Sequence, residues 1–224
     1  MNLEVQGHHL FRQNQQDVAK RQPPRFELIA GALCLDFINT LDDRFSDEPK
    51  ELLNSYLDLA RFGGDAGILG NAQMEHLFER CLQSPAGAKQ ALGAAIQMRE
   101  AMYAVFWALV RKKPVPKAQL TILNSYAQEA ARHMILVETS GRFAWKFDEV
   151  GNEFDAPLWP IARSAAGLLA SDQLRFVRAC ASKTCEWLFL DESKNHRRRW
   201  CDMTKCGNRA KVSSFYKRKK AASG

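Results

Sequence analysis

Four cysteines near the C-terminus constrain the fold of this chain more than any other feature. Four residues separate Cys180 from Cys185 and Cys201 from Cys206, and fifteen residues lie between the two pairs. Each pair can form a tight turn around one side of a metal ion, and the intervening segment is long enough to bring the pairs together. Four thiolates in a tetrahedron favour zinc. The spacing therefore predicts one structural zinc ion, whose four protein ligands leave no coordination position for catalysis.

The six cysteines could instead form three disulfides. However, the first residues are polar and rich in Gln, without the apolar segment of a secretory signal. We therefore expect a cytoplasmic protein, in whose reducing surroundings clustered cysteines hold metal more often than they pair. Cys34 and Cys81 fit apolar positions and are expected in the core. His196 stands beside an arginine run and is expected to be a solvated turn residue rather than a competing ligand.

Length and charge divide the chain into a body and a basic C-terminal module. At 224 residues the chain can bury a sizeable core. No apolar run reaches the roughly 18 to 20 residues that a membrane-spanning helix needs, so no membrane association is expected. The net charge is +7, but residues 173–220 alone hold 14 Lys or Arg against 4 Asp or Glu. A mildly acidic body with a strongly basic module indicates that the module contacts a polyanion, with nucleic acid the first candidate.

Hydrophobic spacing predicts a mainly helical body. A polar tail at 1–25 ends in Pro23-Pro24, and the folded region is expected to begin near Phe26. Gly63-Gly64 is expected to end one helix by adopting the left-handed conformation. Segments with helical spacing or helix start and stop signals lie at about 33–41, 52–62, 72–82, 86–112, 116–133, 155–169 and 173–178.

Residues 135–147 follow a different pattern. β-Branched and aromatic residues cluster around Ser140-Gly141, and aromatics alternate with other residues at 143–147, which predicts a β-hairpin. Three tryptophans are expected to lie in the core rather than to line a pocket: Trp107, Trp145 and Trp159. The predicted fold is therefore mainly α with a β-hairpin (α+β), in which a helical N-terminal domain precedes a small zinc module.

The order of elements around the cysteines predicts a treble-clef-like zinc finger. A strand-like run at 187–191, a polar turn and the arginines at 197–199 should form a zinc-anchored hairpin, and a helix should follow Cys206. In such a short module the metal replaces a hydrophobic core. The predicted divisions are a tail at 1–25, a helical domain at 26–172, a finger at 173–213 and a basic tail at 214–224.

Two stretches resemble known families. The segment Cys206-Gly207-Asn208-Arg209, with RRWCDM at 198–203 and CEWLFLD at 185–191, is similar to the CGNR zinc finger. Upstream, GALCLDFINT at 31–40 resembles the start of the ABATE domain, the usual N-terminal partner of that finger. The resemblance implies a stress-induced bacterial transcription regulator that binds DNA. The family often has Gly directly after the second cysteine, where this chain has Glu186. The difference bears only on the geometry of the local turn.

The cations of the module are the candidate nucleic-acid contacts. On a strand, Arg197 and Arg199 would share one face and Arg198 the other, and one arginine could stack on a tryptophan instead of meeting phosphate. Gly207 and Asn208 are expected to shape the turn. The final basic run either strengthens polyanion binding or only solubilises the chain. The predicted contacts are Arg197, Arg198, Arg199, Lys205, Arg209, Lys211, Lys217 and Arg218.

Asp36 and Asn39 are the candidate pocket residues of the body, where they would line a site for a small-molecule effector. Alternatively, they are buried polar groups that pair with backbone at a helix end. No nucleophile and base pair, phosphate loop or metal-histidine motif indicates an enzyme. The sequence therefore predicts a zinc-dependent, DNA-binding transcription regulator whose helical domain senses an effector or forms a homodimer. The alternative is a finger that binds RNA or a protein partner without sequence-specific DNA recognition.

Overall fold

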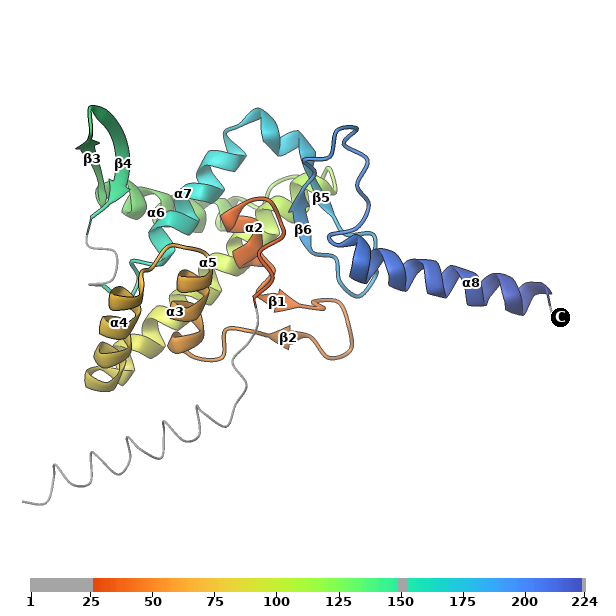
Figure 1. Ribbon diagram of the computed structural model, residues 1–224, viewed down its shortest axis with the longest axis horizontal. Helices are drawn as coiled ribbons and strands as arrows, with labels where there is room; N and C mark the ends of the chain where they lie inside the picture. The colour runs from red at the N-terminus through yellow and green to blue at the C-terminus, as the bar shows by residue number, and fades with distance from the viewer. Residues whose placement is uncertain (1–25, 149–152, 223–224) are drawn as a thin grey trace, which may run out of the picture.

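The computed structural model describes residues 26–148 and 153–222 and shows a helical body from which one C-terminal helix projects (Figure 1). The predicted tail at 1–25 lies outside these residues. The body contains α2 (Leu33–Ile38), α3 (Tyr56–Asp65), α4 (Asn71–Gln83), α5 (Pro85–Val110), α6 (Lys117–Arg132) and α7 (Leu158–Leu169). Its strands are β1 (Leu41–Asp42), β2 (Lys50–Glu51), β3 (Met134–Thr139) and β4 (Arg142–Phe147). The C-terminal part contains η1 (Asp172–Phe176), β5 (Val177–Ala179), β6 (Leu188–Leu190), η2 (Met203–Gly207) and α8 (Asn208–Ala222).

The predicted fold class is confirmed, because helices dominate and the strands form only small antiparallel pairs. The short helix α2 is central to the packing and contacts α5, α7 and β6. Its side chains Cys34, Leu35, Phe37 and Ile38 are buried. The body helices and the first part of the zinc module therefore share one hydrophobic core. Among the described residues, no helix is both long enough and apolar enough to cross a membrane.

The end of α3 corrects a prediction. The helix continues through Gly63 and Gly64, and the left-handed residue that follows it is Gly67, with φ 70°. A Cβ at Gly63 would lie 2.8 Å from Cδ1 of Leu69, and one at Gly64 would collide with the side chain of Met74. These two glycines therefore let the segment that leads into α4 pack closely on α3, and their conformational freedom is not what ends the helix.

The predicted β-hairpin is confirmed as β3 and β4, which pair from Met134 with Phe147 to Thr139 with Arg142. Its two-residue turn has positive φ at both Ser140 and Gly141, as a type I′ turn requires. The prediction that Trp145 is a core residue is wrong, since Trp145 is 59% exposed. The hairpin extends beyond the helices, so that only its base reaches the core. Trp159 is buried and Trp107 half-buried, as expected.

The strand pairing in the zinc module also differs from the prediction. β6 pairs with β5, with Val177 opposite Leu190 and Ala179 opposite Leu188, whereas residues 197–199 form no strand. The chain turns away after β6 because the buried carboxylate of Asp191 accepts hydrogen bonds from Ser193 and from the backbone of Arg198. The helix predicted at 173–178 is a shorter 3-10 turn, η1, followed directly by β5.

The basic tail predicted at 214–224 is helical through Ala222, as the second half of α8. No Gly or Pro occurs from 208 to 222, and Ala, Lys and Arg are strong helix formers. Figure 1 shows α8 projecting away from the body at the end of the molecule opposite the β3–β4 hairpin. The basic C-terminal segment is therefore a helical arm.

Candidate metal centre and basic surface

The four predicted ligands meet at one point. All four cysteines are buried, none is in a disulfide, and their Sγ atoms lie within 4.8 Å of one another. Cys185 and Cys201 have Sγ atoms 3.6 Å apart, and Cys201 and Cys206 have theirs 3.7 Å apart. A tetrahedral site with Zn–S bonds of about 2.3 Å separates its sulfurs by about 3.8 Å. The residues fit the metal, and the site holds one zinc ion.

The charges of four closely spaced thiolates also favour a bound cation. Hydrogen bonds from Cys185 and Cys201 hold the pKa of Cys180 well below its usual range, and the bond to Cys180 raises the pKa of Cys185. Burial raises the pKa of Cys206. Four thiolates at this spacing repel each other when no cation lies between them. A divalent cation removes that conflict by binding all four as thiolates.

The first cysteine pair is closed by a strained turn. The amide of Cys180 donates to the carbonyl of Trp187 at 2.8 Å, and the amide of Glu186 donates to the carbonyl of Ser182 at 3.1 Å. Glu186 has φ 48°, in the left-handed region that favours glycine. This is the position where the sequence departs from the CGNR pattern. Its carboxylate forms an ion pair with Arg111 at 3.1 Å, which ties this turn to the end of α5.

Each residue of the tetrapeptide Cys206-Gly207-Asn208-Arg209 has a structural role at the metal site. Cys206 is the fourth ligand, and a Cβ at Gly207 would lie 3.2 Å from Cδ1 of Trp200. The side chain of Asn208 donates to the carbonyl of Thr204 at 2.8 Å, as expected of a turn-shaping residue. The guanidinium of Arg209 lies 4.0 Å from Sγ of Cys206 and places positive charge beside that thiolate.

The arginine run points in different directions. Arg198 is half-buried, lies over the ring of Phe189 at 4.6 Å, and donates to the carbonyls of Trp200 and Cys201. It braces the second cysteine pair and is not placed as a free phosphate contact. Arg197 and Arg199 are exposed, but the guanidinium of Arg199 lies over the ring of Trp200 at 5.1 Å, so the expected stacking of one arginine on a tryptophan is found at Arg199. The expected separation of Arg198 from its two neighbours therefore holds, although no strand produces it.

The remaining predicted contacts fall into three groups. Lys211 is exposed, and within the described residues no carboxylate pairs with Arg197, Arg199 or Lys211. Lys205 forms an ion pair with Glu27, which occupies its charge and ties η2 to the start of the body. Arg209 stays largely exposed and has Asp43 at 4.0 Å. The last two, Lys217 and Arg218, lie on α8, but their side chains are outside the described residues.

Asn39 connects the body to the zinc module. Its side-chain amide donates to the carbonyl of Leu188 at 2.9 Å and accepts from the amide of Leu188 at 3.1 Å, so it pairs with β6 as another strand would. Beside it, the carbonyl of Ala30 accepts from the amide of Leu190 at 2.7 Å. Asp36 accepts from the amide of Ala30 at 2.8 Å, and burial raises its pKa to about 6. Both candidate pocket residues therefore bind backbone, the second of the two predicted alternatives.

His196 does not approach the metal site as a ligand. Its ring stacks on Phe176 with centroids 3.8 Å apart, and its Nδ1 donates to the carbonyl of Asp191 at 2.7 Å. Its φ of 46° shows that it occupies a tight turn. Of the other two cysteines, Cys34 is buried as predicted and Cys81 is half-buried.

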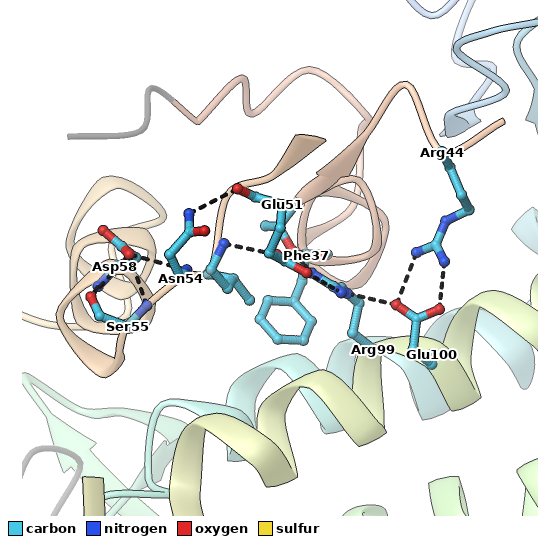
Figure 2. Close-up of polar contacts among 10 residues, drawn as sticks. Phe37, Arg44, Glu51, Asn54, Ser55, Asp58, Arg99 and Glu100 are labelled. Atoms are coloured by element: carbon cyan, nitrogen blue, oxygen red, sulfur yellow. Dashed lines mark hydrogen bonds and ion pairs between the residues drawn. The ribbon is translucent and has the colours of Figure 1, made fainter. Parts of the chain in front are cut away.

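The sequence analysis missed a buried ion-pair network in the body. Arg99, only 2% exposed, binds both carboxylate oxygens of Glu51 at 2.6 Å and also contacts Glu100 at 2.9 Å. Figure 2 shows Arg99 between the two carboxylates, with Arg44 paired to Glu100. Burial lowers the pKa of Arg99, but its hydrogen bonds and ion pairs with Glu51 and Glu100 together outweigh burial and raise that pKa. The sequence did contain a signal for the burial of Arg99, because Arg99 lies in helical phase with the buried Ala95 and Met102 on α5.

The fold and the metal site define a helical protein with a structural four-cysteine zinc finger. Two family models match the chain. One, ABATE, described as "Putative stress-induced transcription regulator", matches residues 31–172, and the other, the CGNR zinc finger, matches residues 177–219. The first match covers more than half of the chain, and the protein belongs to this ABATE family. A search of curated proteins found no match.

Proposed function

We propose that this protein is a DNA-binding transcription regulator of the bacterial cytoplasm, in which zinc shapes the DNA-binding surface. The observation that carries the proposal is the distribution of charge around the metal site. Arg197, Arg199 and Lys211 are exposed, and no Asp or Glu follows Asp202 in the sequence. None of the three pairs with a carboxylate among the described residues, although Arg199 also lies over the ring of Trp200, and exposed cations of this kind on one module are suited to phosphate.

The helical arm α8 extends this surface. Seven Lys or Arg lie between 203 and 222, and 208–222 form the single helix α8. Figure 1 shows α8 projecting from the body, and in this proposal that arm lies along a duplex. In this proposal the finger and α8 bind the phosphate backbone, and the body forms a dimer or responds to an effector. In this proposal the chain acts by binding, and its zinc is structural because four cysteines fill the coordination of the ion.

The first experiment selects DNA from a randomised duplex library at physiological salt, with zinc-loaded protein, and sequences the retained DNA. A recurrent motif supports sequence-specific regulation, and a two-fold symmetric motif adds that the protein binds as a dimer. Retention without a motif would limit the module to phosphate binding and would contradict sequence-specific regulation by this protein.

Two sets of variants separate contact from structure. Arg197→Ala with Arg199→Ala should weaken DNA binding and make the salt dependence of log K shallower by about 2 if each side chain meets one phosphate. Stability and zinc content should stay unchanged. Arg198→Ala is the matched control, because it removes hydrogen bonds to Trp200 and Cys201 and should lower the stability of the finger itself. If the double variant binds DNA like the wild type, the arginine surface is not the interface.

A second candidate function is binding of single-stranded RNA. Two aromatic side chains on α8, Phe215 and Tyr216, are exposed beside the cations. Bases stack on exposed aromatic rings in single-strand binding, and each stacked base contributes about 1 to 3 kcal/mol. Competition between duplex DNA and single-stranded RNA at physiological salt decides between the two functions. Preferential displacement by RNA, with sensitivity to Phe215→Ala, would favour this second function.

A further inference from the structure

The β3–β4 hairpin presents an apolar face to solvent. In its register Leu136 lies opposite Trp145 and Glu138 lies opposite Phe143, and opposed residues of an antiparallel pair share one face. Leu136, Phe143 and Trp145 are 55%, 71% and 59% exposed. At the base of the same face, Phe147 packs against the core. The inner end of this face is therefore covered by the body, and its outer end is open.

The area of this face is large for a monomer. A fully buried aromatic side chain covers about 150 to 250 Å², so the exposed parts of these three residues amount to roughly 400 Å². Apolar patches of about 300 to 600 Å² are the largest found on typical monomers and are often functional. The face also adjoins a hollow of about 330 Å³ between α6 and α7, lined by four alanines and Gly167, by Ser164 and Arg163, and by Met134 from the hairpin.

We propose that this face binds the same face of a second copy of the chain, which makes the hairpin the dimer surface of the protein. Two such faces bury about 800 Å² of apolar area, most of the roughly 1,000 Å² that a specific interface requires, and the half-buried Met134 and Phe147 lie on the same face beside it. This inference rests on the proposed function in one respect. The proposed function lets the body form a dimer, and the inference assigns that dimer to one surface of the body.

Charge on the hairpin is compatible with this pairing. The apolar face carries one carboxylate, that of Glu138, and the amide of Gly141 binds it within the hairpin turn. The cations Arg142 and Lys146 belong to the opposite face, because they pair with Thr139 and Ile135. Each apolar face therefore brings only one charged group, the hydrogen-bonded carboxylate of Glu138 at its outer end, to a self-complementary interface.

The position of the hairpin suits a DNA-binding dimer. Figure 1 shows it at the end of the molecule opposite α8. A dimer formed there leaves both zinc modules and both α8 arms uncovered. The two copies of the basic surface are then related by two-fold symmetry, which matches the symmetry of a palindromic site.

The test measures the oligomeric state of full-length, zinc-loaded protein by sedimentation equilibrium from 1 to 100 μM. The wild type should sediment as two copies of a 25.4 kDa chain at high concentration. Phe143→Ser with Trp145→Ser should raise the dimer dissociation constant at least tenfold. Lys146→Ser, on the other face of the same strand, is the matched control and should leave the constant unchanged. A monomeric wild type, or a dimer that persists in the double variant, overturns the proposal.

Hydrogen exchange covers the case in which the double variant loses its hairpin. In wild-type protein, amides of residues 134–147 should exchange more slowly at 100 μM than at 1 μM, and protection that is independent of concentration contradicts the proposal. Sedimentation with anionic vesicles by a protein that stays monomeric would assign the face to lipid instead. Because none of these measurements contains DNA, a failure of the dimer surface is distinguishable from a failure of the proposed DNA binding.

Discussion

Replacement of Asn39 by alanine tests whether the zinc module is fixed to the body by specific hydrogen bonds. The side chain of Asn39 is buried and bonds to both backbone polar groups of Leu188, which is itself fully buried in β6. Alanine removes both partners and leaves the amide and the carbonyl of Leu188 without their bonds to the body. A buried backbone group without a partner costs about 1 to 3 kcal/mol, so the two together predict a loss of roughly 2 to 5 kcal/mol.

The assay is urea unfolding of zinc-loaded protein at a constant free zinc concentration, because bound metal adds to the apparent stability. Asn54→Ala is the matched control. Asn54 is exposed and donates one hydrogen bond to the carbonyl of Glu51, so its loss should cost less than about 1 kcal/mol. The amides of Leu188 and Leu190 should also exchange faster in the Asn39 variant, since Leu190 bonds to Ala30 beside it.

The reasoning is refuted if Asn39→Ala is no less stable than Asn54→Ala. A large loss of stability with unchanged exchange of the β6 amides would also contradict it, because the cost would then arise elsewhere in the body. Asn39→Asp keeps an acceptor for the amide of Leu188 and places a second carboxylate oxygen against its carbonyl. That variant should therefore be at least as unstable as the alanine variant.

Three further predictions follow from the same structure. Zinc chelation, or Cys201→Ser, should unfold residues from about 180 onward and leave the helical body folded. Circular dichroism and hydrogen exchange measure this loss of structure, and an unchanged finger after complete metal removal would contradict the prediction. Arg99→Met should cost about 1 to 3 kcal/mol in urea unfolding, because it removes the bonds to Glu51 while Glu100 keeps Arg44 and both carboxylates stay partly exposed, whereas Arg132→Met at an exposed ion pair should cost under about 1 kcal/mol. Burial raises the pKa of Asp36 from 3.8 to about 6, so folding binds a proton and stability falls as pH rises between these values. Asp36→Asn should remove this loss, and its stability relative to wild type should be roughly 2 kcal/mol greater at pH 7.5 than at pH 4.5; an equal difference at both values would show that the carboxyl titrates normally.

The features that could be predicted from the sequence are those set by local chemistry. Metal ligands are restricted to a few residue types, so the spacing of Cys180, Cys185, Cys201 and Cys206 indicated both the ion and the turns that hold it. Hydrophobic periodicity placed the helices within a few residues, and the Ser140-Gly141 turn identified the hairpin. Each of these signals lies within one segment of the chain.

The features that could not be predicted depend on distant segments. The run at 187–191 has the composition of a strand, but nothing in it shows that its neighbours are β5 on one side and Asn39 on the other, 149 residues away. Alternation of aromatic residues predicted the hairpin but not whether a helix would cover Trp145. Gly63 shows the same limit, because its closeness to Leu69 depends on how α3 meets the next segment.

The structure separates two requirements for the basic surface. Zinc sets its shape, because the second cysteine pair and the start of α8 are connected through the metal. The body sets its position, because β6 is fixed by Asn39 and Ala30 without any metal contact. If the proposed function is correct, Cys201→Ser and Asn39→Ala should both weaken DNA binding, yet only the cysteine variant should lose zinc. Equal zinc loss in both would show that the body also stabilises the metal site, and unchanged DNA affinity in the Asn39 variant would show that the finger binds DNA without a fixed position on the body.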